Sequence, residues 1–527
     1  MARAAARLAA GRQSRLIALG AVAWTRAALV LIASGALGVA ALSGGETADP
    51  RTPGGMPGMA PPFLGTAVVG SGGTAAAIDA YGDVVDLRAP GAAGRALIDN
   101  PADRQAAGSV PADTGIVPRL LVGAGSSLPL WRADSVRQRY RAGTNVLVTD
   151  ARFGSARVRI VYAARGDRLA CLTRSSPGSV VSVGSSEPGL RSRLSCNDGA
   201  ARSTVRASTG SDRRWLSRAR QLGRGAPPWA RHMYERSLLT LRALTDRRTG
   251  AVAAGARDGW AYVWPRDGGT AALAYAAAGY RSEARRVARF LLRLDLDAAA
   301  RFHGDGAPVT GREAQGDASA WVAVAAQAAG LAIPSRGLPW NERPDYQESA
   351  PGTFLANAVA AGFNPPFDGP EIRLYGGKSA HQPGAEEIAG AFGVPRGLVR
   401  RAGEPESGLD SAAAWAVRPF PQPALFPAVR RTLLRLTAEQ TRFGITPGEA
   451  WPGVDPWTAP TAWTAWSLAA LGERRAALRL LAALRRAVTP AGALPERVDT
   501  RTGVPTSTTP LAWSHAFAIL ALRELWP

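Results

Sequence analysis

The sequence predicts a multidomain chain made of an N-terminal membrane or signal segment, an antiparallel β-sandwich and a closed toroid of helices. Its 527 residues exceed what one hydrophobic core usually holds. Short alternating runs divided by turn residues, typical of a sandwich, precede many helix-length stretches rich in alanine, leucine and arginine. We place the basic flank and apolar segment at 1–43, a Gly/Pro-rich tether at 44–62, the sandwich at 63–220 and the helical domain at 226–527.

The composition excludes several classes of protein. With 46% apolar and 20% charged residues the chain is globular rather than disordered. The net charge of +22 comes from arginine, since Lys378 is the only lysine. The arginines form no basic stripe and no nucleic-acid motif, so we expect no nucleic-acid partner. The histidines and cysteines lie too far apart for a zinc site of Cys and His, while a metal held by carboxylates alone stays open.

The N-terminal segment is an apolar run with a basic flank. Ala27–Ser43 carries no charge, and five arginines precede it. By the positive-inside rule, a single transmembrane span here places the N-terminus in the cytoplasm and the bulk of the chain outside the plasma membrane. A signal peptide cleaved near 41–43 is the alternative and predicts a secreted protein. In an oxidising compartment Cys171 and Cys196 could pair, although two free thiols also stay open.

The sandwich is predicted from short runs bounded by Gly, Asp, Asn, Ser or Pro. Gly70–Ala75 formally matches a dinucleotide-binding fingerprint, but a second turn at 81–83 leaves no room for the helix that such a site requires. We therefore interpret Gly70–Ala75 as a hairpin turn. The sequence pattern typical of strands extends to about Arg214. The expected strands are 66–70, 76–79, 84–87, 144–150, 158–163 and 179–183.

The toroid is predicted from ten helical stretches that follow one another with Gly, Pro or Asp between them. No repeat of fixed period is present, which favours a closed toroid over an open solenoid. The region 363–406 is rich in Gly and Pro and predicts only weak helices such as 384–392. The expected helices are 228–245, 267–279, 281–294, 316–330, 350–361, 408–416, 424–440, 460–471, 473–488 and 510–525.

The connections between these helices carry the candidate site residues. The stretch 258–267 combines three aromatic side chains with Arg266 and Asp267 where a helix begins. Aromatic faces cover the C–H patches of a sugar ring, and an Arg-Asp pair forms charge-assisted hydrogen bonds to adjacent hydroxyls. The structural alternative is that Asp267 caps the helix and the aromatics belong to the core.

Two loop glutamates are candidate partners in acid-base chemistry. Glycoside hydrolysis needs one protonated carboxyl group and one ionised carboxylate, and Glu348 and Glu496 each lie in a loop next to a predicted helix. By composition alone, Glu348 could instead be a first-turn helix acid and Glu496 a solvated loop charge. Glu342, Glu406 and Glu449 are reserve candidates, with Glu449 first because Trp451 is near it.

The order of these motifs resembles glycoside hydrolase family 15, the glucoamylase, glucodextranase and bacterial trehalase group. The resemblance covers the chain from about Phe63 to the end. It rests on "DGWAYVWPRDGGTAALAYAAAGY" at 258–280, "PDYQES" at 344–349 and "GALPERVDTRTGVPTSTTPLAWSHA" at 492–516, with a weaker match in "GSGGTAAAIDAYGDVVDL" and "RQRYRAGTNVLVTDARF".

The resemblance implies a super-β-sandwich followed by an all-α (α/α)6 barrel, a six-hairpin toroid. It implies an exo-acting inverting hydrolase that releases glucose from α-linked glucosides or glucans and needs no metal or organic cofactor. By position, Glu348 is the general acid and Glu496 the base that activates water. The sugar-binding residues implied in the same way are Arg266, Asp267, Trp264, Trp513 and, in "VDPWTAPTAW", Trp457.

Two departures leave an alternative open. Gln347 stands where the family commonly has Trp before the acid, and Ser349 replaces the acidic residue that often follows it. The alternative is a catalytically inactive, membrane-anchored carbohydrate-binding or cell-envelope scaffold protein that uses the same aromatic pocket. The sequence predicts an oligosaccharide or polysaccharide partner in both cases, and it leaves the glycosidic linkage and the oligomeric state open.

Overall fold

The computed structural model extends over the predicted sandwich and helical parts. It describes residues 56, 58–98, 115–122, 126–177, 179–183, 190, 193–256, 259–333, 338–339, 354–363, 367–368, 372–373, 379–380 and 383–527. The predicted apolar segment Ala27–Ser43 lies outside these residues. Within them, no helix is both long and apolar enough to cross a bilayer.

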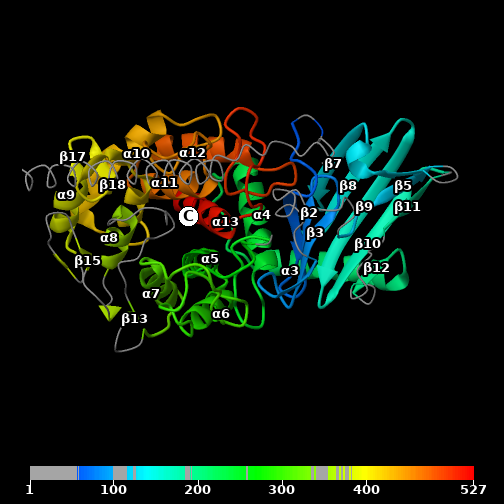
Figure 1. Cartoon of the computed structure of the whole chain (residues 1–527), viewed down its shortest axis with the longest axis horizontal. Helices are drawn as coiled ribbons and strands as arrows, with labels where there is room; N and C mark the ends of the chain where they lie inside the picture. The colour runs from blue at the N-terminus through cyan, green and yellow to red at the C-terminus, as the bar shows by residue number, and fades with distance from the viewer. Residues whose placement is uncertain are drawn as a thin grey trace, which may run out of the picture. The chain divides into compact units, whose positions relative to one another are not determined.

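The β-rich part consists of two main sheets that face each other, with a smaller third sheet beside them (Figure 1). Buried polar contacts join the main sheets: the Gln138 amide donates to the Asp79 carbonyl at 2.7 Å, and the Tyr140 hydroxyl donates to the Val68 carbonyl at 2.7 Å. The first sheet has the order β1(Gly65–Gly70), β2(Ala75–Asp79), β3(Val84–Ala89), β4(Arg95–Ile98). The second has the order β12(Leu194–Cys196), β10(Arg168–Ser175), β9(Ala156–Arg165), β8(Leu147–Phe153), β7(Ser135–Tyr140), and the third joins β11(Val180–Ser182), β5(Arg119–Val122) and β6(Ser126–Pro129).

A helix covers the other face of the five-stranded sheet, and its place was predicted wrongly. The sequence pattern typical of strands was expected to continue to about Arg214, whereas α3 spans Gly199–Leu216. Its buried face includes Ala201 and Val205, which pack in a separate small core against the buried side chains of β8, β9 and β10. The prediction of antiparallel strands also fails at one pair, because β12 runs parallel to β10.

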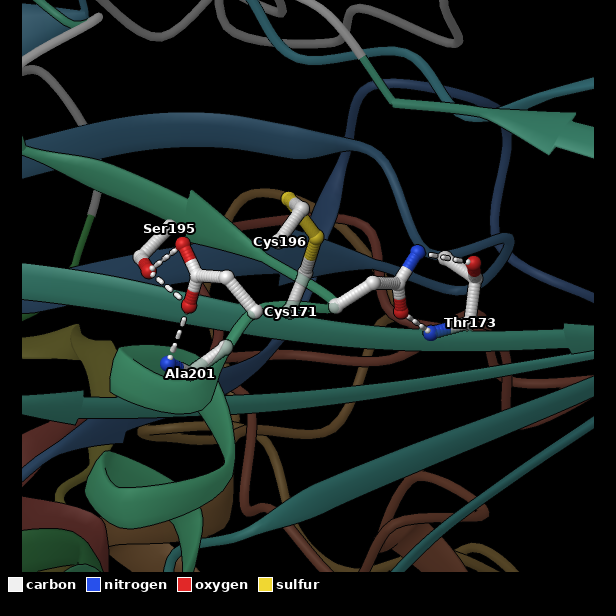
Figure 2. The surroundings of a disulfide bond; sticks show 7 residues. Cys171, Thr173, Ser195, Cys196 and Ala201 are labelled. Carbon is white, nitrogen blue, oxygen red and sulfur yellow. Dashed lines mark hydrogen bonds between the residues drawn. A yellow bond between two sulfur atoms is a disulfide. The ribbon is translucent and has the colours of Figure 1, made fainter.

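The disulfide between Cys171 and Cys196 lies at that parallel pair (Figure 2). The two half-cystines are register partners, with a Cα–Cα distance of 4.6 Å. The chain then turns directly into α3, where Asp198 caps the helix by accepting from the Ala201 amide at 2.7 Å (Figure 2). The covalent bond and the cap together fix the point where the β-rich part ends.

The Gly70–Ala75 prediction of a hairpin turn is confirmed. Gly70 and Ala75 are register partners at the closed end of the β1–β2 pair. Gly72 has a φ of +82°, and a Cβ there would lie 2.9 Å from the Thr245 carbonyl oxygen, so the turn needs a glycine at this position. The hairpin is packed against the start of the connection that follows α4(Pro228–Leu244).

The helical part contains a closed ring of six elements, each packed against the next. Their order around the ring is α5(Pro265–Ala277), α7(Ala318–Ala328), α8(Leu355–Ala361), the 3₁₀ helix η4(Ser411–Ala416), α11(Thr458–Ala470) and α13(Ala512–Leu525), and α13 closes on α5 (Figure 1). These sequences are nearly free of charge and rich in Ala and Trp, as expected for helices buried on all sides.

An outer set of helices packs against the ring. In α6 and α12 the arginines lie mostly outside a buried apolar stripe, which is the pattern of a half-exposed helix. They are α4 on α13, α6(Arg281–Leu291) on α5, α10(Phe426–Ala438) on η4 and α12(Arg474–Ala487) on α11.

The predicted helices agree with the observed ones within a few residues, with two exceptions. The stretch 408–416 forms the tail of a strand and a 3₁₀ helix rather than an α-helix. In the described part of 363–406, the weak helix prediction at 384–392 corresponds to α9(Ala385–Phe392), but the hairpin β17(Gly393–Val394), β18(Gly397–Arg401) and β19(Glu404–Leu409) was not predicted.

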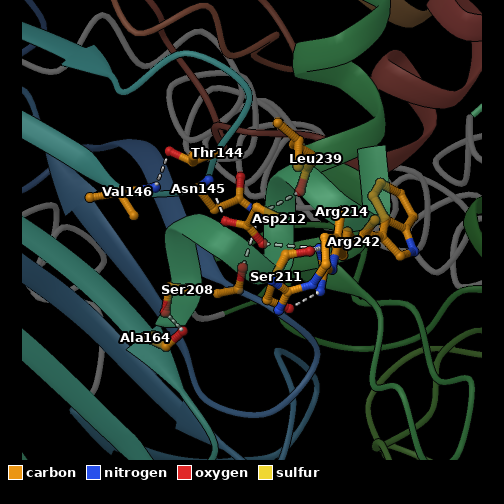
Figure 3. Close-up of polar contacts among 12 residues, drawn as sticks. Thr144, Asn145, Val146, Ala164, Ser208, Ser211, Asp212, Arg214, Leu239 and Arg242 are labelled. Carbon is orange, nitrogen blue, oxygen red and sulfur yellow. Dashed lines mark hydrogen bonds and ion pairs between the residues drawn. The ribbon is translucent and has the colours of Figure 1, made fainter. Parts of the chain in front are cut away.

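Buried polar contacts connect the sandwich to the helices. The Asn145 side-chain amide donates to the Gly70 carbonyl at 2.9 Å and to the Leu239 carbonyl of α4 at 2.8 Å (Figure 3). The guanidinium of Arg236 in α4 lies 3.8 Å from the centre of the Tyr140 ring. Because these groups are buried, separating the two parts would leave several polar atoms without partners.

Candidate active site

The candidate site lies where the N-terminal ends of several ring helices meet. Side-chain contacts join these ends in pairs: Arg266 of α5 reaches Asp317, the residue before α7, and Thr458 of α11 donates to Ser514 of α13 at 2.8 Å. Trp264 and Trp457 are the cap residues of α5 and α11. The positive ends of several helix dipoles therefore point toward one region.

Arg266 is held rigidly in the first turn of α5. Its Nη1 donates to the Gln315 side-chain oxygen at 3.0 Å and to the Asp317 carboxylate at 3.0 Å. Both ion-pair partners are almost fully buried, with 7% and 1% of their side chains exposed. The guanidinium also lies 4.8 Å from the centre of the Trp513 ring. Arg266 and Trp513, which were predicted separately as sugar-binding residues, thus lie against each other.

Asp267, the next residue, has an unusual protonation equilibrium. Burial raises its pKa to about 7, Arg266 opposes this shift, and the negative charges of Glu496 and Asp317 add to it. Asp267 therefore lies within electrostatic reach of Glu496, although the two residues are far apart in the sequence. Near neutral pH the Asp267 carboxyl group can both donate and accept hydrogen bonds.

Backbone hydrogen bonds with the start of α11 and with the loop before α13 fix the position of Glu496. The Thr458 amide at the start of α11 donates to the Glu496 carbonyl at 2.9 Å, and the Glu496 amide donates to the Thr508 carbonyl at 2.9 Å. The Thr458 hydroxyl donates to the Pro495 carbonyl. At the side chain, the Ser507 hydroxyl donates to Oε2 of Glu496, which stabilises a negative charge there.

His515 holds the loop that carries Glu496 in place. The Leu494 amide donates to its Nε2 at 2.9 Å, so the ring proton is on Nδ1, which lies 2.9 Å from the Ser237 hydroxyl. Burial, together with the nearby Arg236, lowers the pKa of His515 to about 3, so the ring stays neutral at physiological pH. His515 therefore acts as a structural support for the loop and not as a proton donor.

The predicted aromatic residues line this end of the ring. Trp513 is packed edge-on against Trp463, with ring centres 5.2 Å apart. Trp264 lies beside Tyr262, and the Arg301 guanidinium lies 5.7 Å from the Trp264 ring centre. Trp457 contacts Trp451 edge-on at 5.5 Å between ring centres. A backbone bridge pairs Trp457 with Arg497, directly after Glu496.

Some predicted residues are placed elsewhere or not described. Glu348 and Glu342 lie outside the described residues. Glu449 forms an ion pair with Arg396 at 2.9 Å and accepts from the Leu409 amide, so its carboxylate is already engaged. Glu406 is exposed.

Asp317 and Gln315 were missed by the sequence analysis, as was Ser507. Asp317 stands directly before a helix of alanines and a tryptophan, which is the position of a capping residue, and this signal could have identified it as a residue of the ring end. Its side chain bonds Arg266 and the Trp321 indole of α7 and makes no capping bond to a backbone amide of that helix. Gln315 and Ser507 carry no comparable signal. No three His, Cys, Asp or Glu side chains converge as metal ligands in the described part of the chain.

Comparisons with known proteins bear on the family and the fold. Residues 228–302 match the family model described as glycosyl hydrolases family 15. The structure of a bacterial glucoamylase complexed with acarbose is similar at a TM-score of 0.61, with 13% sequence identity over 90% of this chain and 95% of that chain. No significant match was found among the curated proteins.

Two further solved structures are more distant. A wild-type glycosidase has 20% identity over 60% of this chain and 98% of its own, and the Saccharomycopsis fibuligera glucoamylase has 13% identity over 58% and 96%. Their TM-scores of 0.43 and 0.41 are too low to support an argument.

The family match and the fold together support an O-glycosyl hydrolase. Residues 228–302 are thus similar to glycosyl hydrolases family 15, and the fold is similar to that of a bacterial glucoamylase.

Proposed function

We propose that the protein is an exo-acting, inverting glycoside hydrolase that releases glucose from α-linked glucosides or glucans. The observation that carries this proposal is the meeting of Arg266, Asp267 and Trp513 at one end of the ring, with Glu496 within electrostatic reach. An aromatic face next to a buried Arg-Asp pair matches the two kinds of surface that a sugar ring presents. The acarbose-bound glucoamylase of similar fold supports a sugar ligand.

The proposal includes the finer architecture. The six ring elements are the inner layer of an (α/α)6 barrel, and the helices outside them are its outer layer. The barrel corresponds to 226–527 and the sandwich to 63–220.

In the proposed reaction, Glu348 protonates the leaving oxygen and Glu496 deprotonates the attacking water. The Ser507 hydroxyl suits Glu496 to this role, because it favours the ionised carboxylate. Arg266 and Asp267 hold the hydroxyls of the terminal sugar, and Trp513 and Trp264 cover its apolar faces. An inverting enzyme separates its two carboxyl groups by roughly 6.5–9.5 Å to admit the water.

We also propose that the protein works outside the cytoplasm, either anchored by Ala27–Ser43 or secreted after cleavage. The Cys171–Cys196 disulfide supports this location, because such bonds persist mainly in oxidising compartments.

The test is anomer-resolved proton NMR of the full chain with maltose, isomaltose and trehalose. Wild type is compared with Glu496→Gln and Glu348→Gln, and Glu439→Gln serves as a control because Glu439 is an exposed glutamate at the end of α10. We expect release of β-glucose from at least one sugar. Each active-site variant should lower the rate by at least about a hundredfold, and the control should not.

The outcomes distinguish the two functions. The sugar that is cleaved identifies the linkage. Binding of sugars without any glucose release by a folded protein would contradict the hydrolase and support the carbohydrate-binding scaffold. Release of α-glucose would contradict inversion, and activity that survives Glu496→Gln would contradict the role of that residue.

A further inference from the structure

A cavity of about 200 Å³ lies at the seam between the sandwich and the helices, away from the candidate active site. The β1–β2 hairpin turn contributes Ser71 and Gly72 to its wall, and the rest comes from β9, from α3, α4, α5 and α6, and from the connection after α4. We call this cavity the seam pocket. None of the residues proposed for sugar hydrolysis lines it.

Arginines dominate the wall of the seam pocket. The wall contains one carboxylate, Glu283, and four arginines, which are Arg165, Arg242, Arg247 and Arg286. They come from β9, from the last turn of α4, from the connection after α4 and from α6, so the fold gathers side chains that are distant in the sequence. A surplus of positive charge in a partly enclosed space attracts anions.

Arg242 is the fixed part of this wall. It forms an ion pair with the buried Asp212 at 3.0 Å, and its second amino group donates to the Ser211 hydroxyl at 2.9 Å (Figure 3). Its guanidinium also lies 5.0 Å from the centre of the Trp215 ring. The guanidinium is therefore already oriented, which lowers the entropy cost of binding a ligand.

Glu283 belongs to the wall, and its negative charge offsets that of one arginine, Arg286. It accepts from the Trp215 indole at 3.0 Å and from the Ser282 hydroxyl at 2.6 Å, and Arg286 lies 3.8 Å away. Although burial opposes it, these hydrogen bonds hold the pKa of Glu283 below its ordinary value, so the group is ionised and engaged.

Arg165 and Arg247 are the arginines of the wall whose side chains are accessible to a ligand. Both side chains are exposed, and neither forms an ion pair with a carboxylate of the described residues. The Arg247 amide donates to the Gly72 carbonyl at 3.2 Å, which fixes its backbone against the hairpin. The exposed guanidinium groups of Arg165 and Arg247 thus share the wall of the seam pocket with the oriented guanidinium of Arg242.

We propose that the seam pocket binds a phosphate group, either as free phosphate or as part of a sugar phosphate. Guanidinium groups match phosphate oxygens with paired hydrogen bonds, and phosphate carries enough charge to engage several of them. The volume of about 200 Å³ leaves room for a phosphate group. This proposal is independent of the proposed hydrolysis.

The test is isothermal titration calorimetry of the full chain with three probes: inorganic phosphate, glucose 6-phosphate and glucose. Arg247→Gln is compared with Arg248→Gln, an exposed neighbour outside the pocket, and Arg165→Gln with Arg168→Gln, its partner across the β9–β10 turn. We expect both pocket variants to weaken phosphate binding about tenfold or more, and both controls to stay within about twofold. Binding should weaken as the NaCl concentration rises.

The relative affinities of the two phosphate probes distinguish free phosphate from a sugar phosphate. Equal affinity for the two phosphate probes supports free phosphate, and at least tenfold tighter binding of glucose 6-phosphate supports a sugar phosphate. No heat from either phosphate probe, or an equal loss in the pocket and control variants, would overturn the proposal. Circular dichroism of each variant checks that the fold is intact, and glucose release should be unchanged by Arg247→Gln.

Discussion

Two groups of buried carboxyls show what distinguishes a structural acid from a functional one. Asp79 and Asp83 lie in the sandwich core at the β2–β3 turn, and Asp267 and Asp317 lie at the end of the helical ring. Each pair is shielded from water almost completely. The pairs differ in what surrounds them.

In the sandwich, backbone amides satisfy Asp79, and its negative charge acts on Asp83. Asp79 accepts hydrogen bonds from the amides of Phe63, Tyr81 and Asp83. Burial raises the pKa of both acids, and each carboxyl group acts on the other, so the pair retains a proton as the pH rises. This arrangement fixes a turn and presents nothing to a ligand.

In the ring, a cation lies among the acids. Arg266 binds Asp317 directly and opposes the rise in the pKa of Asp267, which stays near 7 rather than higher. Trp513 lies over the same guanidinium. Burial alone raises the pKa of a carboxyl group. Burial next to a fixed cation such as Arg266 limits that rise, so the pKa of Asp267 lies near 7 and the group exchanges protons at neutral pH.

The largest effect is expected from removing that cation. Arg266→Gln should lower kcat/KM for glucose release by at least about a hundredfold, because the sugar loses a charged partner. It should also lower the free energy of unfolding by about 3 kcal/mol or more, since Asp317 remains buried without its partner. Urea denaturation and a glucose assay measure the two effects. Arg289→Gln on the exposed face of α6 is the control, and equal behaviour of the two variants would contradict the role of Arg266.

Asp267→Asn should reduce activity and also change how stability depends on pH. The folded protein holds the Asp267 proton up to a pKa of about 7, whereas the unfolded chain releases it near 3.8. Asp267 therefore stabilises the fold fully below about pH 4, and this contribution, on the order of 4 kcal/mol, is lost as the pH rises toward 7. Thermal unfolding from pH 4 to 7 should show a smaller decline in the variant. An unchanged slope would mean that Asp267 is not buried as described.

Asp83→Asn should separate the two groups of acids. The pKa of Asp83 is raised by burial and by Asp79, so its stabilising contribution is also present at low pH and lost as the pH rises through the folded pKa. An amide of the same shape removes that loss, and we expect a stability gain of about 1 kcal/mol at pH 7 with no change at pH 4. Glucose release should be unaffected. A loss of activity would show that the sandwich acids reach the active site.

The smallest effect is expected at Ser507. Ser507→Ala removes one hydroxyl donor from the Glu496 carboxylate, which should lower kcat roughly three- to tenfold and leave KM nearly constant. The acidic limb of the kcat–pH profile should shift to higher pH, because the ionised form of Glu496 loses stabilisation. Ser507→Thr retains the hydroxyl and should restore most of the rate. A purely structural role would change stability without moving the profile.

The helical ring was largely predictable because its sequence repeats one simple pattern. Alanine-rich stretches bounded by Gly or Pro gave α5, α7, α11 and α13 nearly to the residue. In contrast, α3 was missed because its Ser, Thr and Gly residues have low helix propensity. Its apolar face, with Ala201 and Val205 four residues apart, is explained only by the sheet it covers.

The candidate site was predictable where a motif was long and not where one residue acts alone. Arg266 and Trp513 come from opposite ends of the helical part, and only their separate motifs suggested that they meet. The contribution of Asp317 depends on the folding of α7 beside α5, which no local pattern encodes. The four arginines of the seam pocket come from four separate segments, so their proximity is a property of the fold.

The position of α13 has a consequence for how the protein is made. The ring begins with α5 and closes with α13, whose starts are separated by roughly 250 residues, so this closing contact is highly non-local. At a synthesis rate of about 5–20 residues per second, α5 emerges from the ribosome on the order of ten seconds or more before its last neighbour exists. During that interval the apolar surfaces of the earlier ring helices are uncovered, and chaperones that bind such surfaces would have their main opportunity then.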